Sequence, residues 1–171
     1  MQNNGFIAVG TLAVVVLFFG LRGFDDDGRY NPLREPEPLR VEMMDGAPSE
    51  IIISARRDGH FMLDGRINGR PTRMMVDTGA SIVTLRESDA RKAGIQPSER
   101  DYRIPFQTAN GEVLGAPATL PALEIDELIL RDLAVVVLPD DKLSTSLFGV
   151  NGLNRFERRE TTRDKLILYT N

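Results

Sequence analysis

The stretch Met74–Val83, MMVDTGASIV, decides the fold, because it sets one acidic residue among small residues between two apolar runs. Such apolar runs are typical of buried strands, so Asp77 is expected in a tight turn between two of them. The small residues leave room for backbone N–H groups to approach the carboxylate, and two hydroxyls among them can fix it. The pattern predicts a rigidly held acid or base with four supporting residues, Thr78, Gly79, Ala80 and Ser81.

On both sides of this turn, short β-branched or apolar runs alternate with Asp-Gly, Asn-Gly and Pro breaks. That texture is typical of a sheet protein whose consecutive strands are joined by tight turns. The continuous apolar run Leu133–Leu138 is expected to be a central strand buried on both faces. The other predicted strands are Ile51–Arg56, Phe61–Ile67, Thr72–Val76, Arg103–Thr108, Glu112–Leu120 and Leu166–Tyr169.

Local signals predict two hairpin tips and two short helices. Asn68-Gly69 and Asn110-Gly111 are expected at hairpin tips, because two-residue turns need residues that tolerate positive φ. A helix is predicted over Glu87–Ala93 and closed by Gly94, the residue best suited to the left-handed conformation beyond a helix end. A second helix is predicted over Val150–Phe156, after a strand end.

Two of these segments carry a resemblance to a known family. Val76–Ser81 resembles the aspartic proteases of the retropepsin kind, whose signature is apolar-apolar-Asp-Thr-Gly-Ala-Ser. Leu147-Phe148-Gly149 resembles their second signature, although Phe148, Val150 and Gly152 stand where Leu, Met and a bulkier residue are more familiar. The resemblance implies a mainly all-β fold, a closed acid-protease-type β-barrel with one or two short helices, in a domain of residues 51–171.

The same resemblance implies a homodimer. Pepsin-type chains carry two Asp-Thr/Ser-Gly motifs in two lobes, whereas this chain has one such motif, so Asp77 would meet its copy at a twofold axis. Thr78 would hydrogen-bond across the dimer beneath the aspartates, and Gly79 and Ala80 would contact substrate. The hairpin that corresponds to the family's flap contains the other expected substrate-binding residues, Thr108, Ala109, Asn110 and Gly111.

The expected activity is that of an aspartic endopeptidase, with Asp77 as the catalytic residue. Two carboxylates that lie close together cannot easily both ionise, so the pair would share one proton and activate a water by general acid–base catalysis. No metal or organic cofactor is expected. An extended peptide would bind under the flap by strand addition.

Two alternatives come from other classes of protein. A catalytically silent module of the same fold, tethered to a membrane and binding peptides or dimerising, has no need of an aspartate in this turn. A serine hydrolase would have to use the single histidine, His60, but no Gly-x-Ser-x-Gly elbow occurs. We interpret His60 as a solvated residue at the end of a strand.

The N-terminal segment predicts a membrane protein. Residues 5–21, GFIAVGTLAVVVLFFGL, are uncharged and largely apolar, and about 25 Å of helix from such a run can span a thin bilayer. Residues 1–21 are therefore predicted to be a transmembrane helix, although a cleaved secretory signal stays open. Residues 22–50, rich in Pro and charge, are predicted to be a flexible tether.

The location expected for such a protein is the bacterial inner membrane, crossed once, and the side that holds the protease domain stays open. Positive residues usually stay in the cytoplasm, and four arginines follow the apolar run, Arg22, Arg29, Arg34 and Arg40. The family resemblance favours the periplasm instead.

Composition excludes several other classes. The chain of 171 residues has no cysteine, which removes thiol nucleophiles and cysteine-ligated metals, and one histidine, which removes a multi-histidine metal site within one chain. Its formal net charge is −4 and no long basic block occurs, so nucleic-acid binding has little electrostatic support.

Overall fold

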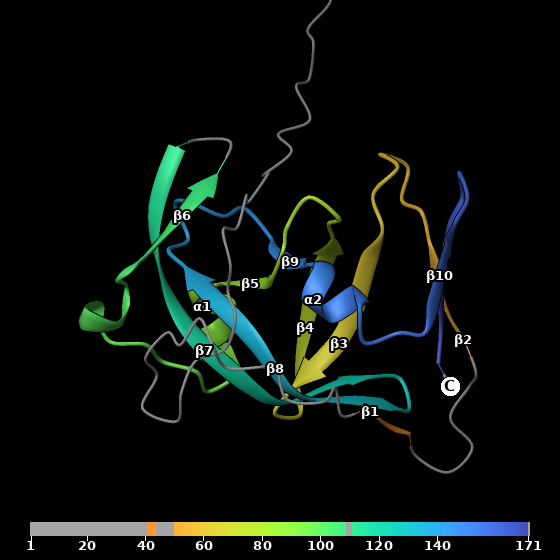
Figure 1. Cartoon of the computed structure of the whole chain (residues 1–171), viewed down its shortest axis with the longest axis horizontal. Coiled ribbons are helices and arrows are strands. Elements are labelled where there is room, and N and C mark those ends of the chain that lie inside the picture. Colours follow the sequence, from red (N-terminus) through yellow and green to blue (C-terminus); the bar gives the residue numbers. More distant parts are fainter. Residues whose placement is uncertain (1–40, 44–49, 109–110, 171) are drawn as a thin grey trace, which may run out of the picture.

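A computed structural model describes residues 41–43, 50–108 and 111–170 (Figure 1). Within these ranges the chain is mostly β, as predicted. The helices are α1 (Glu87–Lys92) and α2 (Val150–Leu153), with a 3-10 turn at Glu99–Asp101. The strands are β1 (Val41–Met43), β2 (Glu50–Ser54), β3 (Met62–Ile67), β4 (Arg70–Val76), β5 (Val83–Arg86), β6 (Ile104–Thr108), β7 (Gly111–Ile125), β8 (Leu128–Leu138), β9 (Ser146–Phe148), β10 (Arg158–Thr161) and β11 (Lys165–Tyr169).

The larger sheet closes into a barrel. Its strand order is β1-β8-β5-β9-β4-β3-β7-β6, and a further pairing of β7 with β8 closes a ring of six strands, β8-β5-β9-β4-β3-β7. β4 lies parallel to β9, and β5 lies parallel to β8. The predicted closed β-barrel is therefore confirmed. Because the apolar faces of all six strands point inward, most of the buried residues belong to one core.

A smaller sheet of three strands, in the order β10-β11-β2, packs beside the barrel. Ile51 and Ile53 of β2 and Leu166 and Leu168 of β11 are buried in the barrel's core, while all four residues of β10 are exposed. In Figure 1 the β10–β11 turn, the loop between β4 and β5, and the end of the β6–β7 hairpin all lie on the upper side of the view. In this view the β4–β5 loop, which contains Asp77, is drawn between the β10–β11 turn and the β6–β7 hairpin.

The local turn signals fold as expected at two places. Asn68 and Gly69 have φ of 51° and 72°, and the β3–β4 register pairs the residues on either side of them. α1 ends at Lys92, and Gly94 follows with φ of 83°. Both turns use the positive φ that their sequences permit.

Of the second predicted hairpin tip, Asn110-Gly111, only Gly111 is among the described residues. The prediction put Asn110-Gly111 in the turn, but Gly111 is the first residue of β7 and pairs with Thr108. Residues 109 and 110, between this pair in the sequence, lie outside the described residues. Gly111 adopts a φ of 101°, a conformation that glycine tolerates and other residues rarely adopt.

Two strands extend into the segment predicted to be a tether. β1 pairs antiparallel with the start of β8, and β2 begins at Glu50. Three residues are too few to show the period-two pattern of a strand, which is why β1 was not predicted. Within the ranges that the structure covers, no helix is long and apolar enough to cross a membrane, and the predicted anchor lies outside those ranges.

Candidate active site

Asp77 is the first residue of the loop between β4 and β5 and is held from three sides by backbone groups. Its N–H donates to the carbonyl of Phe148 in β9 at 3.1 Å, and its carbonyl accepts from the N–H of Ala80 at 3.3 Å. Its carboxylate oxygen Oδ1 accepts a hydrogen bond from the N–H of Gly79 at 2.8 Å. The carboxylate of the half-buried Asp77 is therefore oriented by the Gly79 N–H.

The small residues of the loop divide into an outer and an inner pair. Thr78 and Gly79 are exposed, whereas Ala80 is fully buried and Ser81 is partly buried. Ala80 and Ile82 are both buried in a second apolar cluster. This packing anchors the loop to the protein interior. The loop thus presents Asp77, Thr78 and Gly79 at the protein surface.

The second predicted signature, Leu147-Phe148-Gly149, passes directly beside the loop. A Cβ atom at Gly149 would lie 2.4 Å from the carbonyl oxygen of Ile82 and 2.7 Å from that of Ala80. The N–H of Val150 donates to the carbonyl of Ala80 at 2.8 Å. Only glycine permits this approach of two backbones, so the strand and the loop position each other.

Asn151 is a further residue that braces the loop, and sequence reasoning missed it. Its Oδ1 accepts from the N–H of Val83 at 2.7 Å, and its Nδ2 donates to the carbonyl of Ala134 in β8 at 2.7 Å. Its own N–H donates to the carbonyl of Ser81 at 3.1 Å. No local signal could have found these partners, because the residues involved are far apart in the sequence.

The β6–β7 hairpin, predicted to be the flap, packs over the same cluster. Phe106 and Val113 face each other across the hairpin, are 3% and 8% exposed, and belong to the cluster of Ala80 and Ile82. Near its tip the hydroxyl of Thr108 donates to the carbonyl of Gly111 at 2.8 Å. Of the four predicted flap residues, Ala109 and Asn110 lie outside the described part of the chain.

His60 lies in the turn between β2 and β3, next to Asp58. Its N–H donates to Asp58 Oδ1 at 3.1 Å, and its Nδ1 lies 3.3 Å from the same oxygen. That hydrogen bond from the His60 backbone is the largest cause that lowers the pKa of the Asp58 carboxyl. Within the described ranges, no group of three or more His, Asp or Glu side chains is arranged to hold a metal ion.

The fold and this loop define a class of protein, and comparisons with known proteins agree. Residues 63–155 match the family model described as gag-polyprotein putative aspartyl protease. The crystal structure of a retropepsin-like aspartic protease from Rickettsia conorii is similar, with a TM-score of 0.64 and 35% identity over 79% of this chain and 97% of that chain. The chain therefore belongs to the retropepsin-like aspartic protease family.

Two curated relatives extend the comparison. An uncharacterized protein of Rickettsia prowazekii (strain Madrid E) is 37% identical over 119 residues, which cover 70% of this chain and 51% of that protein. An uncharacterized protein encoded in the cobV 5′ region of Sinorhizobium sp is 28% identical over 95% of this chain and 69% of that protein. The chain thus spans about half the length of the Rickettsia prowazekii protein and about two thirds of the length of the Sinorhizobium protein.

Proposed function

We propose that this protein is an aspartic endopeptidase whose active site forms when Asp77 of two copies meets at a twofold axis. The observation that supports it best is the orientation of the Asp77 carboxylate, held by the Gly79 N–H on an exposed loop. One chain offers a single Asp-Thr-Gly motif, whereas water activation in this family's chemistry needs two carboxylates. The second copy supplies the second carboxylate.

The proposed mechanism divides one proton between the two carboxylates. Two like charges a few ångströms apart repel, so one Asp77 is ionised and takes a proton from the attacking water. The other is protonated and donates to the scissile carbonyl oxygen as it becomes negative. The hydrolysis forms no covalent intermediate and uses no cofactor.

The remaining site residues have binding and positioning roles in this proposal. The exposed Thr78 hydroxyl bonds across the dimer beneath the aspartates, and Ser81 supports the loop. Gly79 and the flap residues Thr108 to Gly111 contact an extended peptide, whose backbone adds as a strand under the flap. Ala80, which the family resemblance expected to contact substrate, is fully buried and supports the loop instead. The apolar N-terminal run anchors the enzyme to a membrane, so its substrates are proteins or peptides that reach that surface.

A peptide-cleavage assay tests the proposal directly. The full-length chain in detergent, incubated with a generic peptide pool, is expected to cleave it, and a pepstatin-type inhibitor is expected to stop the cleavage. Products are identified by mass spectrometry. A well-folded chain that cleaves no peptide in the pool would favour the silent binding module.

Activity is expected to fall as the pH rises above neutral. The active dimer carries one shared proton, and raising the pH removes it, which leaves two ionised carboxylates and no acid for the carbonyl. Initial rates on one peptide, measured from acidic to alkaline pH, check this. Melting temperatures at each pH serve as the control for unfolding, and a rate that keeps rising into the alkaline range argues for another chemistry.

A further inference from the structure

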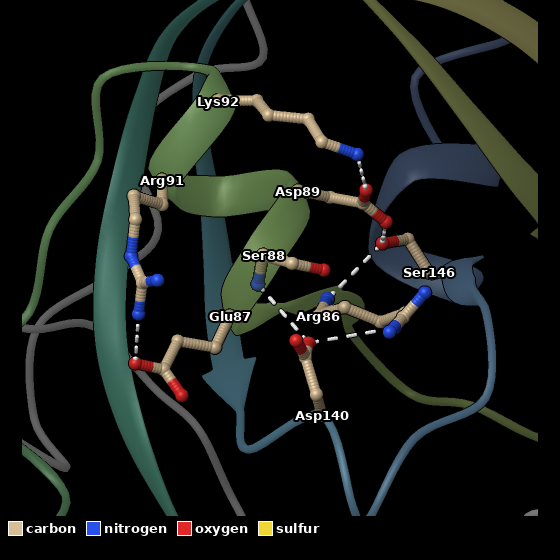
Figure 2. A network of polar contacts seen from close by, with 8 residues as sticks. All are labelled: Arg86, Glu87, Ser88, Asp89, Arg91, Lys92, Asp140 and Ser146. Atoms are coloured by element: carbon tan, nitrogen blue, oxygen red, sulfur yellow. Dashed lines mark hydrogen bonds and ion pairs between the residues drawn. The ribbon is translucent and has the colours of Figure 1, made fainter.

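A polar network ties the start of α1 to the connection between β8 and β9 (Figure 2). The connection, residues 139–145, begins after Leu138 and ends before Ser146. Asp140, near its start, and Ser146, directly after its end, both hydrogen-bond to the segment Arg86–Asp89. We call the contacts of Arg86, Ser88, Asp89, Asp140 and Ser146 the α1 clip.

Asp140 makes the first tie of the α1 clip. α1 begins after Arg86, which makes no side-chain cap, and the carboxylate of Asp140 instead accepts from the N–H of Ser88 at 3.0 Å. The same oxygen lies 3.4 Å from Nε of Arg86, a buried nitrogen with no hydrogen-bond partner among the described residues. Asp140 therefore serves both as the missing helix cap and as the charge partner of Arg86.

The protonation of Asp140 agrees with this geometry. The hydrogen bond from the Ser88 N–H is the largest cause that lowers the pKa of the Asp140 carboxyl, and the charges of Arg86 and Arg91 add to it. A carboxyl with a lowered pKa stays ionised further into the acidic range than a free one. The Asp140 carboxylate therefore keeps its charge for Arg86 further into the acidic range.

Ser146 makes the second tie, at the other end of the connection. Its fully buried hydroxyl accepts from the N–H of Arg86 at 3.0 Å and donates to Asp89 Oδ2 at 2.8 Å. Lys92 lies 3.4 Å from the other oxygen of Asp89. Because both ends are tied to one rigid segment, the α1 clip fixes where the connection lies.

The connection matters because its Leu143 packs against the candidate active site. Leu143 is 3% exposed and belongs to the apolar cluster of Ala80 and Ile82 from the Asp77 loop and of Phe106 and Val113 from the flap. Beyond Ser146, β9 runs to Phe148, whose carbonyl holds the Asp77 N–H. Moving the connection would therefore move apolar side chains that adjoin both the loop and the flap.

We propose that Asp140 is a positioning residue for substrate binding: through Arg86 and Ser88 it fixes the β8–β9 connection, whose buried Leu143 packs in one apolar cluster with the Asp77 loop and the flap hairpin. This inference rests on the proposed endopeptidase function. Asp140 does not touch the reacting atoms in this proposal. It acts through the buried Leu143, which packs against the Asp77 loop and the flap hairpin, so it controls how well these two segments hold a peptide rather than how fast the bound peptide is cut.

The test compares Asp140→Ala, Asp140→Asn and wild type in the full-length protein, with several peptides that differ in the apolar residues at the cleaved bond. Asp140→Ala is expected to raise KM about fivefold with kcat nearly unchanged, a modest effect because the tie is partly exposed. Asp140→Asn keeps an oxygen for the Ser88 N–H and is expected to recover part of the loss. The matched control is Asp141→Ala, an exposed neighbour whose ion pair with Lys142 at 2.9 Å is local; its KM is expected to equal that of wild type.

Each other outcome overturns the inference. An unchanged KM in Asp140→Ala does so, as does an equal rise in Asp141→Ala. A fall in kcat alone for every peptide, together with a lower melting temperature, would show a role in folding only. If wild type cleaves nothing, the proposed function itself has failed, and that result is distinct from the others.

Discussion

Asp77→Asn is expected to reduce peptide cleavage at least about a thousandfold while leaving a folded dimer. The substitution removes the titratable oxygen and with it the shared proton, but it changes the side-chain volume little. The amide oxygen of asparagine can still accept the hydrogen bond from the Gly79 N–H, which is 2.8 Å long in the native loop. Initial rates measure the loss, and melting temperature and light scattering measure fold and dimer.

Asp126→Asn is the matched control for this charge change. Asp126 is exposed in the turn between β7 and β8 and has a φ of 51°, which asparagine tolerates well. The control is expected to cleave at the wild-type rate. Undiminished turnover by Asp77→Asn would reject the mechanism outright.

Gly149→Ala is expected to lower the free energy of unfolding by about 3 kcal/mol and to remove activity. Its φ of −84° is open to alanine, so the effect comes from steric contact alone. The added methyl group would meet the carbonyl oxygens of Ile82 and Ala80 at 2.4 Å and 2.7 Å. Because both are backbone atoms, relief requires moving the loop that holds Asp77. Urea unfolding and initial rates check the two effects.

Gly152→Ala gives the comparison for Gly149→Ala. A methyl group there would also make close contacts, at 2.6 Å to Phe148 and 3.0 Å to Val83, but with side-chain atoms. Side chains can shift more readily than a hydrogen-bonded backbone, so a smaller loss of stability is expected. A Gly149→Ala protein as stable as wild type would contradict the role of this close approach.

Local rules predicted the parts of the fold that local physics decides. Asn68-Gly69 and Gly94 adopt the positive φ values that their sequences suggested, and the apolar run Leu133–Leu138 lies within β8. Asp77 lies in a tight turn between two strands, as the motif Met74–Val83 predicted. In each case the deciding residues are neighbours in the chain.

Strand lengths depended on tertiary contacts and were predicted less well. β7 continues beyond the predicted end at Leu120 to Ile125, although Pro121 lies between them. The proline is tolerated because the β7–β8 register passes from the Leu120–Leu133 pair to the Ala122–Arg131 pair, and the intervening Asp132 has a φ of 51°. Proline lacks an N–H to donate, so a local interruption of the ladder accommodates it.

The braces of the candidate site could not be predicted either. Asn151, Asp140 and Ser146 are polar residues without a motif, and their partners lie 17 to 68 positions away. Closure of the barrel brings these partners together. The α2 helix is also shorter than the predicted Val150–Phe156, ending at Leu153, after which Phe156 packs into the core.

The most direct test of the account is a mixing experiment between wild type and Asp77→Asn at constant total concentration, with subunits allowed to exchange. If two copies of Asp77 make one site, a mixed dimer is inactive, and an equal mixture retains about a quarter of the wild-type rate. If each chain carries a complete site, the same mixture retains about half. A rate that follows the square of the wild-type fraction is the predicted result, and a rate that follows the fraction linearly would contradict the shared active site.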